Sequence, residues 1–172
     1  MSFYNQLLLI HFMIVNKQLI LPQGTPAPDF SLQSTSNENI TLSSFKGKKN
    51  VILVFYPADK TPVCTNQLTF YNELVSVFEG YNAQLLAINN DSLASHFEFA
   101  NQLGLDFPLL SDETGTVLRS YGVFNHTSNT SLRALFVLDS TGTIQWSYLS
   151  PLNKNPGAGG ILKALEKISP SN

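Results

Sequence analysis

Runs and spacings of hydrophobic residues along the chain predict alternating strands and helices. Residues 50–56 form an unbroken run of mostly β-branched, aliphatic and aromatic side chains, which is typical of a strand buried on both faces, and residues 83–90 predict a second buried strand. Between them, hydrophobic residues recur at three- and four-residue spacing, which predicts one amphipathic helix that begins near Cys64 and ends at Gly80. The residues of this stripe are Leu68, Tyr71, Leu74, Val75 and Phe78.

The rest of the pattern completes an α/β arrangement. Asp91 or Ser92 can cap a helix that ends at Gly104, because Asp and Ser are favoured N-caps and glycine is favoured after the last turn. The other predicted elements are a strand at 29–32 after an extended segment, a short turn ending at Gly47, a short strand and helix within 107–123, a β-hairpin over 133–149 and a final helix over 159–168. This order predicts an α/β sandwich around a mixed sheet.

The length of the chain is that of one self-sufficient domain. A chain of 172 residues buries roughly 70% of the surface that its unfolded form exposes, so we expect one domain over residues 21–172. Residues 1–20 form an extension whose apolar run, 7–15, is shorter than the ~20 residues of a membrane helix. No basic residue precedes the run, so a secretory signal fits poorly. We expect an extra strand or helix packed on the domain, or an upstream start codon with a native start near Met13.

Charge and cysteine content exclude several classes of function. A formal net charge of −2 without a cluster of Lys and Arg gives no basic surface for nucleic acid. The single cysteine, Cys64, can form neither an internal disulfide nor a structural zinc site. We therefore expect no metal, no cofactor, no nucleic-acid partner and a location in the reducing cytoplasm.

Cys64 has two interpretations. Free cysteines usually pack as small hydrophobic residues, so Cys64 taken alone would be structural. Its position favours a reactive thiol, because it follows a loop at the carboxyl end of a central strand and lies in the first turn of the predicted helix. Backbone N–H groups and the helix dipole favour an anion there, and a thiolate is such an anion. Pro62 suits this opening turn, and Thr61 can cap the helix or contact a substrate.

Residues 55–67, with the sequence FYPADKTPVCTNQ, resemble the active-site loop of the peroxiredoxins. The family pattern of a proline, a threonine or serine and a cysteine is matched by Pro57, Thr61 and Cys64. The resemblance spans residues 22–168 and includes segments 24–32, 42–57 and 132–146. It implies an α/β thioredoxin-like fold and a thiol-dependent peroxidase, most similar to the one-cysteine and bacterioferritin comigratory protein-like members.

The resemblance also assigns roles to individual residues. It implies that Cys64 attacks the peroxide, that Thr61 and the Cys64 backbone N–H hold the peroxide, and that Pro57 shields the pocket from water. Arg133 matches the essential arginine of the family, which favours the thiolate and orients the reacting groups. Gln67 stands where relatives often have a glutamate, and its role is helix capping or orientation of the arginine.

The single cysteine determines which partners the resemblance implies. Several relatives have a resolving cysteine five residues after the first one, where this chain has Thr69. The expected cycle therefore uses one cysteine, with a peroxide substrate and an external thiol such as glutathione or thioredoxin as reductant. We expect a monomer or homodimer without stable membrane insertion.

Charged residues near the motif have a plainer interpretation. An arginine at a strand start, such as Arg133, is most often a solvated charge. We interpret Asp59 and Lys60 as surface charges of the loop.

Two other classes of function remain open at this point. A cysteine hydrolase or transferase would need a histidine as base, and the chain offers His11, His96 and His126. No local motif marks any of them, and His96 and His126 are predicted to lie on the surface. A binding module could keep the fold and lose the chemistry.

Overall fold

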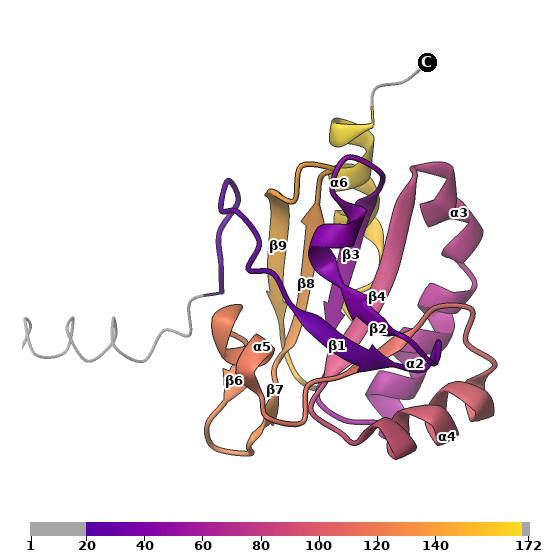
Figure 1. Ribbon diagram of the computed structural model, residues 1–172. Helices are drawn as coiled ribbons and strands as arrows, with labels where there is room; N and C mark the ends of the chain where they lie inside the picture. The colour runs from indigo at the N-terminus through magenta and orange to yellow at the C-terminus, as the bar shows by residue number, and fades with distance from the viewer. Residues whose placement is uncertain (1–19, 170–172) are drawn as a thin grey trace, which may run out of the picture.

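A seven-stranded mixed sheet forms the centre of the protein, in a computed structural model that describes residues 20–169 (Figure 1). In spatial order its strands are β2 (Asn39–Thr41), β1 (Ser31–Ser34), β5 (Leu109–Ser111), β4 (Ala83–Asn89), β3 (Asn50–Phe55), β8 (Arg133–Leu138) and β9 (Ile144–Ser150). β4 runs parallel to β3 and to β5, and the other neighbours are antiparallel. The predicted mixed sheet is confirmed.

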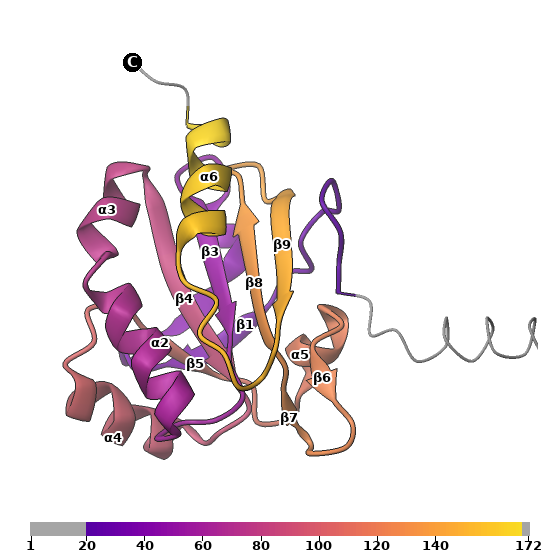
Figure 2. The same ribbon diagram turned by 180° about the vertical axis from the view of Figure 1, so that it is seen from behind.

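Helices cover both faces of this sheet. On the face seen in Figure 2, α2 (Pro62–Asn72), α3 (Val75–Gly80) and α6 (Gly159–Ile168) pack on the strands, and α4 (Leu93–Leu103) contributes Phe99 to the same core. On the other face lie the 3-10 helix η1 (Leu42–Phe45) and α5 (Thr116–Ser120). The predicted α/β sandwich therefore has two hydrophobic cores, one on each side of the sheet.

β3 contributes to both cores. All six of its residues are buried, with Ile52 and Val54 in the core beneath α2 and α6, and Val51, Leu53 and Phe55 in the core beneath α5. Each fully buried aliphatic or aromatic side chain contributes about 1.5–3 kcal/mol relative to exposure. This burial fixes the end of β3, from which the Cys64 loop departs.

The prediction of a single helix from Cys64 to Gly80 is wrong, because this segment forms two helices, α2 and α3. The side chain of Asn72, the last residue of α2, is bonded to a distant loop: its Oδ1 accepts from the Asp106 N–H at 2.7 Å and its Nδ2 donates to the Gly104 carbonyl at 3.1 Å. These tertiary contacts hold the end of α2, and α3 then packs Phe78 into the core on its own axis.

Other predicted elements are confirmed, and three strands were missed. The strand at 29–32, the helix from Ser92 to Gly104, the hairpin and the final helix all appear with small shifts of their ends. The Ser92 side chain caps α4 by accepting from the Ser95 N–H at 3.2 Å. The missed strands are β2 and the small hairpin of β6 (Phe124–Asn125) and β7 (Thr130–Ser131).

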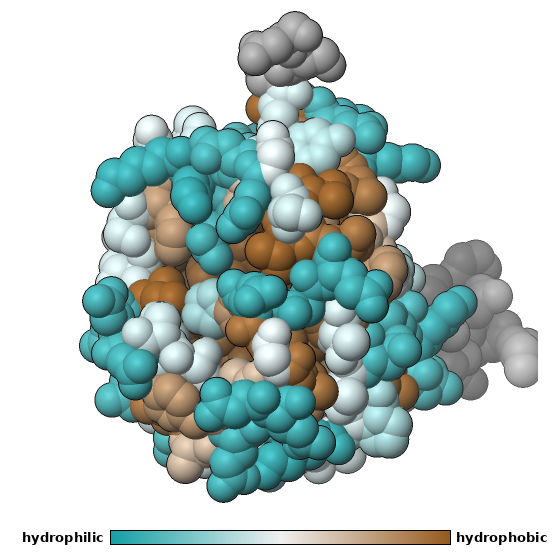
Figure 3. All heavy atoms as spheres, turned by 90° about the vertical axis from the view of Figure 1, so that its right-hand side faces the viewer, coloured by the Kyte–Doolittle hydropathy of each residue, from teal (hydrophilic) through white to brown (hydrophobic). Residues whose placement is uncertain are grey.

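The N-terminal extension is described only at its end. Ile20 and Leu21 pack against the core beneath α5, and the predictions for residues 1–19 lie outside the described residues. Within the described residues, no helix has the length and hydrophobicity needed to cross a membrane. On the side of the molecule at the right of Figure 1, hydrophobic side chains reach the surface in the middle and are bordered by hydrophilic ones (Figure 3).

Candidate active site

Cys64 lies in the first turn of α2, directly after the loop that leaves β3. Thr61 is the N-cap residue and Pro62 the first helical residue, where a missing N–H costs nothing. Cys64 is 0% exposed. The Thr61 side chain makes no capping bond, and its hydroxyl donates to the Ala58 carbonyl at 3.2 Å. The carboxyl-end position predicted for Cys64 is therefore observed, whereas Thr61 caps the helix through its backbone alone.

Arg133 brings a positive charge to this sulfur. It is the first residue of β8, which pairs with β3, and its side chain reaches from the sheet toward α2. Its Nη2 lies 3.4 Å from Cys64 Sγ, and the residue is only 1% exposed. The alternative of a solvated charge does not hold, because a buried guanidinium needs partners inside the protein.

Two more groups accept hydrogen bonds from the guanidinium. Nη1 donates to Gln67 Oε1 one turn after Cys64, and Nε and Nη2 both donate to the Leu152 carbonyl, at 3.2 and 2.9 Å. Gln67 also donates to the Tyr71 hydroxyl at 3.4 Å, which in turn donates to the Gly157 carbonyl at 2.9 Å. The chain between β9 and α6 thus covers the first turns of α2.

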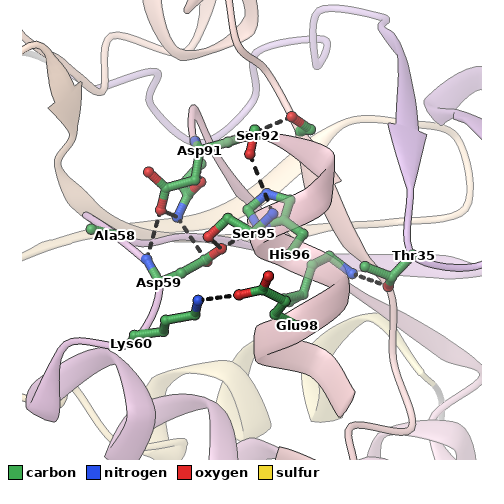
Figure 4. A network of polar contacts seen from close by, with 12 residues as sticks. Thr35, Ala58, Asp59, Lys60, Asp91, Ser92, Ser95, His96 and Glu98 are labelled. Carbon is green, nitrogen blue, oxygen red and sulfur yellow. Dashed lines mark hydrogen bonds and ion pairs between the residues drawn. The ribbon is translucent and has the colours of Figure 1, made fainter. Parts of the chain in front are cut away.

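Asp59 and His96 form a second buried polar cluster, and both were wrongly predicted to lie on the surface. Asp59 is 9% exposed and His96 is 0% exposed, with His96 Nδ1 at 2.8 Å from Asp59 Oδ2. Figure 4 shows Ser95 and His96 extending from α4 toward Asp59. The one available signal was the three-residue spacing of His96 from Phe99, since both are the buried residues of α4.

The other residues singled out from the sequence differ in exposure. Pro57 is partly buried where the loop begins, and Lys60 is exposed as predicted, with its ammonium group paired to Glu98. His126 is exposed, and His11 lies outside the described residues. Within residues 20–169, no three His, Cys, Asp or Glu side chains are grouped so that they could hold a metal ion.

Comparison with known proteins identifies the family. The family model described as AhpC/TSA matches residues 23–147. The chain belongs to the AhpC/TSA family. Alkyl hydroperoxide reductase E of Mycobacterium tuberculosis is 36% identical over 140 residues, which cover 80% of this chain and 89% of that protein.

A solved structure supports the fold of this AhpC/TSA protein. Peroxidoxin BcpB of Mycobacterium tuberculosis superposes with a TM-score of 0.77 at 28% identity, covering 86% of this chain and 96% of that one, which confirms the predicted thioredoxin-like fold. The chloroplastic 2-Cys peroxiredoxin BAS1 of Spinacia oleracea is 34% identical over 155 residues. Those residues cover 84% of this chain but only 58% of that relative.

The charge balance around Arg133 depends on Cys64. Among the described residues, the guanidinium has no carboxylate partner, because Gln67 and the Leu152 carbonyl are neutral. Burial raises the pKa of Tyr71 to about 12, although its hydrogen bond with Gln67 and the charge of Arg133 oppose the rise, so the phenol is neutral at pH 7. A buried charge without a counter-charge costs several kcal/mol. Of the contacts that Arg133 makes within residues 20–169, Cys64 as a thiolate is the one that can provide the counter-charge.

Gln67→Glu is therefore expected to slow the alkylation of Cys64. The new carboxylate would neutralise Arg133 and repel the thiolate, so the rate of alkylation by iodoacetamide at pH 7 should fall severalfold. The measurement is the alkylation rate at pH 7, followed by mass spectrometry.

Asn66→Asp is the matched control for this change. Residue 66 is exposed and precedes Gln67, so the same charge is added one residue away but in solvent. The control should leave the alkylation rate nearly unchanged. An unchanged alkylation rate in Gln67→Glu would contradict the assignment of Cys64 as the counter-charge.

Proposed function

We propose that this protein is a thiol-dependent peroxidase that reduces hydrogen peroxide or organic hydroperoxides through Cys64. The observation that carries the proposal is the 3.4 Å contact between Arg133 Nη2 and Cys64 Sγ, in a site where no carboxylate of residues 20–169 pairs with the guanidinium. This contact favours the thiolate, which is the nucleophilic form of cysteine. Membership of the AhpC/TSA family supports the same activity.

The first step is oxidation of Cys64 by the peroxide. The thiolate attacks one peroxide oxygen, an S–O bond forms and the O–O bond breaks. The other oxygen leaves with the electron pair and takes a proton, so the products are an alcohol, or water, and Cys64 sulfenic acid. Negative charge grows on the leaving oxygen, and donors already in place stabilise it more than they stabilise the substrate.

The residues around Cys64 can supply those donors. Arg133 is the charged donor beside the sulfur, and the Thr61 hydroxyl and the Cys64 backbone N–H lie where the loop meets the helix. We assign Thr61 and the N–H to holding the peroxide, and Arg133 to orienting thiolate and peroxide. Pro57, partly buried at the start of the loop, limits access of water.

The second step needs a thiol from outside the chain, because Cys64 is its only cysteine. A thiol attacks the sulfenic sulfur, an S–S bond forms and water leaves. A second thiol attacks this mixed disulfide, which releases an external disulfide and the Cys64 thiolate. Position 69, five residues after Cys64, is a threonine, so no second sulfur lies on α2.

The reductant, assembly and location follow from this cycle as further parts of the proposal. Glutathione or thioredoxin would serve as reductant, and a monomer or homodimer suffices because the cycle needs no second protein cysteine. A reducing compartment must supply the thiol, and the cytoplasm is such a compartment. The relative from Spinacia oleracea is named as chloroplastic.

A cysteine hydrolase is disfavoured by the contacts of the sulfur. In the described part of the chain, Cys64 Sγ has a hydrogen bond from Arg133 and none with a histidine. His96 has both ring nitrogens engaged elsewhere, with Asp59 and with the Leu110 carbonyl. A general base must reach the proton that it removes.

Trapping of the intermediates tests the proposed cycle. After a brief peroxide pulse, dimedone should label Cys64 as the adduct of a sulfenic acid. With glutathione in place of dimedone, mass spectrometry should show a mixed disulfide at Cys64 that excess glutathione converts back to the thiol. An unmodified Cys64 after the pulse would refute the peroxidase, and a sulfenic acid that no thiol reduces would refute the one-cysteine cycle.

A further inference from the structure

The Asp59 carboxylate is a buried anion within the active-site loop, and the peroxidase chemistry does not use it. Oδ1 accepts from the Tyr56 hydroxyl at 2.7 Å and from Asn89 Nδ2 at 3.3 Å. Oδ2 accepts from Ser95 Oγ and faces His96 Nδ1, both at 2.8 Å. The donors come from the ends of β3 and β4 and from α4, so this one side chain ties the loop to three elements.

His96 meets an acceptor on each side of its ring. Nδ1 faces the Asp59 carboxylate, and Nε2 lies 3.1 Å from the Leu110 carbonyl of β5. A neutral imidazole donates through only one nitrogen, so both contacts are hydrogen bonds together only when the ring carries both protons. Burial alone would raise the pKa of Asp59. The hydrogen bond and charge of His96, together with the hydrogen bonds of Tyr56 and Ser95, outweigh this effect, so the pKa of Asp59 lies below its ordinary value. Asp59 and His96 therefore form a buried, hydrogen-bonded pair.

The loop that this pair holds has a conformation that its own sequence does not favour. Lys60 has a φ of 61°, in the left-handed region that non-glycine residues rarely adopt. Such backbone persists only where the surroundings hold it. On one side of Lys60, the Asp59 N–H donates to Asp91 Oδ2 at 2.7 Å, and on the other side Thr61 begins α2. The contacts of Asp59 therefore set the position of Thr61, which the proposed mechanism assigns to holding the peroxide.

The same cluster lies close to the reacting sulfur. Tyr56, which donates to Asp59, packs in one core cluster with Cys64. Burial raises the pKa of Tyr56 well above its ordinary value, and negative charge on Asp59 and on Cys64 acts in the same direction. The hydroxyl thus remains a donor to Asp59 at neutral pH.

We propose that the buried Asp59–His96 pair positions the active-site loop. The pair holds residues 57–61 in place, so that Thr61 and the first turn of α2, which carries Cys64, are correctly aligned. Neither residue touches the peroxide. The inference rests on the proposed function, because its effect is seen in the reaction of Cys64 with peroxide. Misplacement of a substrate-binding group by about 1 Å can cost about a hundredfold in rate.

Two substitutions of His96 separate the two contacts of its ring. In His96→Asn, the side-chain amide nitrogen can take nearly the place of Nδ1 and keep the hydrogen bond to Asp59. In His96→Gln, the amide nitrogen can take nearly the place of Nε2 and keep the hydrogen bond to Leu110. Both remove the same ring from the same buried position. A difference in reactivity between them therefore reports the link to Asp59.

The readout is the rate of Cys64 oxidation by peroxide compared with the rate of its alkylation by iodoacetamide. Oxidation needs the aligned donors of the loop, whereas alkylation needs only an accessible thiolate. His96→Gln should lower the oxidation rate constant by about tenfold to a hundredfold and leave the alkylation rate within about twofold of wild type. His96→Asn should keep the oxidation rate constant within about threefold of wild type.

Ser95→Ala provides a second test if the His96 variants do not fold. It removes a donor to the same carboxylate oxygen with little loss of packing, and it should lower the oxidation rate constant severalfold.

Glu98→Gln is the matched control, because it removes an exposed ion pair between the same loop and the same helix. It should leave both rates unchanged. Equal oxidation rates in the two His96 variants, or a normal rate in Ser95→Ala, would overturn the positioning role while leaving a reactive wild type as a peroxidase. A wild type that forms no sulfenic acid would overturn the proposed function and this inference with it.

Discussion

Cys64→Ser is expected to reduce peroxide consumption to the uncatalysed rate. The substitution replaces the sulfur with a hydroxyl that is not ionised at neutral pH and cannot form a sulfenic acid. The chain has no other cysteine that could take over. The measurement is the loss of hydrogen peroxide with dithiothreitol as reductant, at equal concentrations of wild type and variant.

The variant should remain folded, because serine is close in size to cysteine and its oxygen can still accept from the buried Arg133. Matching circular dichroism spectra and urea midpoints would establish this. Peroxide consumption at the wild-type rate in a folded Cys64→Ser protein would show that the activity resides elsewhere. Such a result would exclude Cys64 as the nucleophile.

Arg133→Met should lower the rate of Cys64 oxidation by about a hundredfold or more, since loss of one donor to a developing oxyanion typically costs that much. It removes the charge beside the sulfur, and with it the donor that we propose for the leaving oxygen. Stopped-flow measurement of a single oxidation by hydrogen peroxide isolates this step from reduction by thiols. Arg133→Lys should recover only part of the loss, because an ammonium group cannot reproduce the contacts to Cys64, Gln67 and Leu152 together.

Arg119→Met is the control for removing an arginine. Arg119 is exposed on α5, where its guanidinium lies over the Phe124 ring, on the opposite side of the sheet from α2. It should retain the wild-type oxidation rate. An Arg133→Met rate within about threefold of wild type would contradict a role for the guanidinium in stabilising the leaving oxygen.

Local patterns predicted most of the fold, because burial in this protein follows the sequence closely. β3 is an unbroken hydrophobic run and is buried along its whole length. Ser92 and Gly104 mark the ends of α4 by local backbone chemistry. The break between α2 and α3 was missed because Asn72 is held by residues 104–106, a contact that the spacing of α2 does not encode.

The candidate site shows the same division between local and distant information. The place of Cys64 at a helix start could be predicted from neighbouring residues. Its contact with Arg133, 69 residues away, was expected only through family resemblance. The Asp59–His96 pair was missed because charged loop residues and helix histidines are usually exposed, and only the folded chain shows that each meets its partner.

The most direct test of the proposed chemistry is the rate constant for oxidation of Cys64 by hydrogen peroxide at pH 7. An ionised sulfur beside a guanidinium and oriented donors should react at least about a hundredfold faster than free cysteine measured in the same buffer. A rate constant equal to that of free cysteine would contradict an activated thiolate at this site.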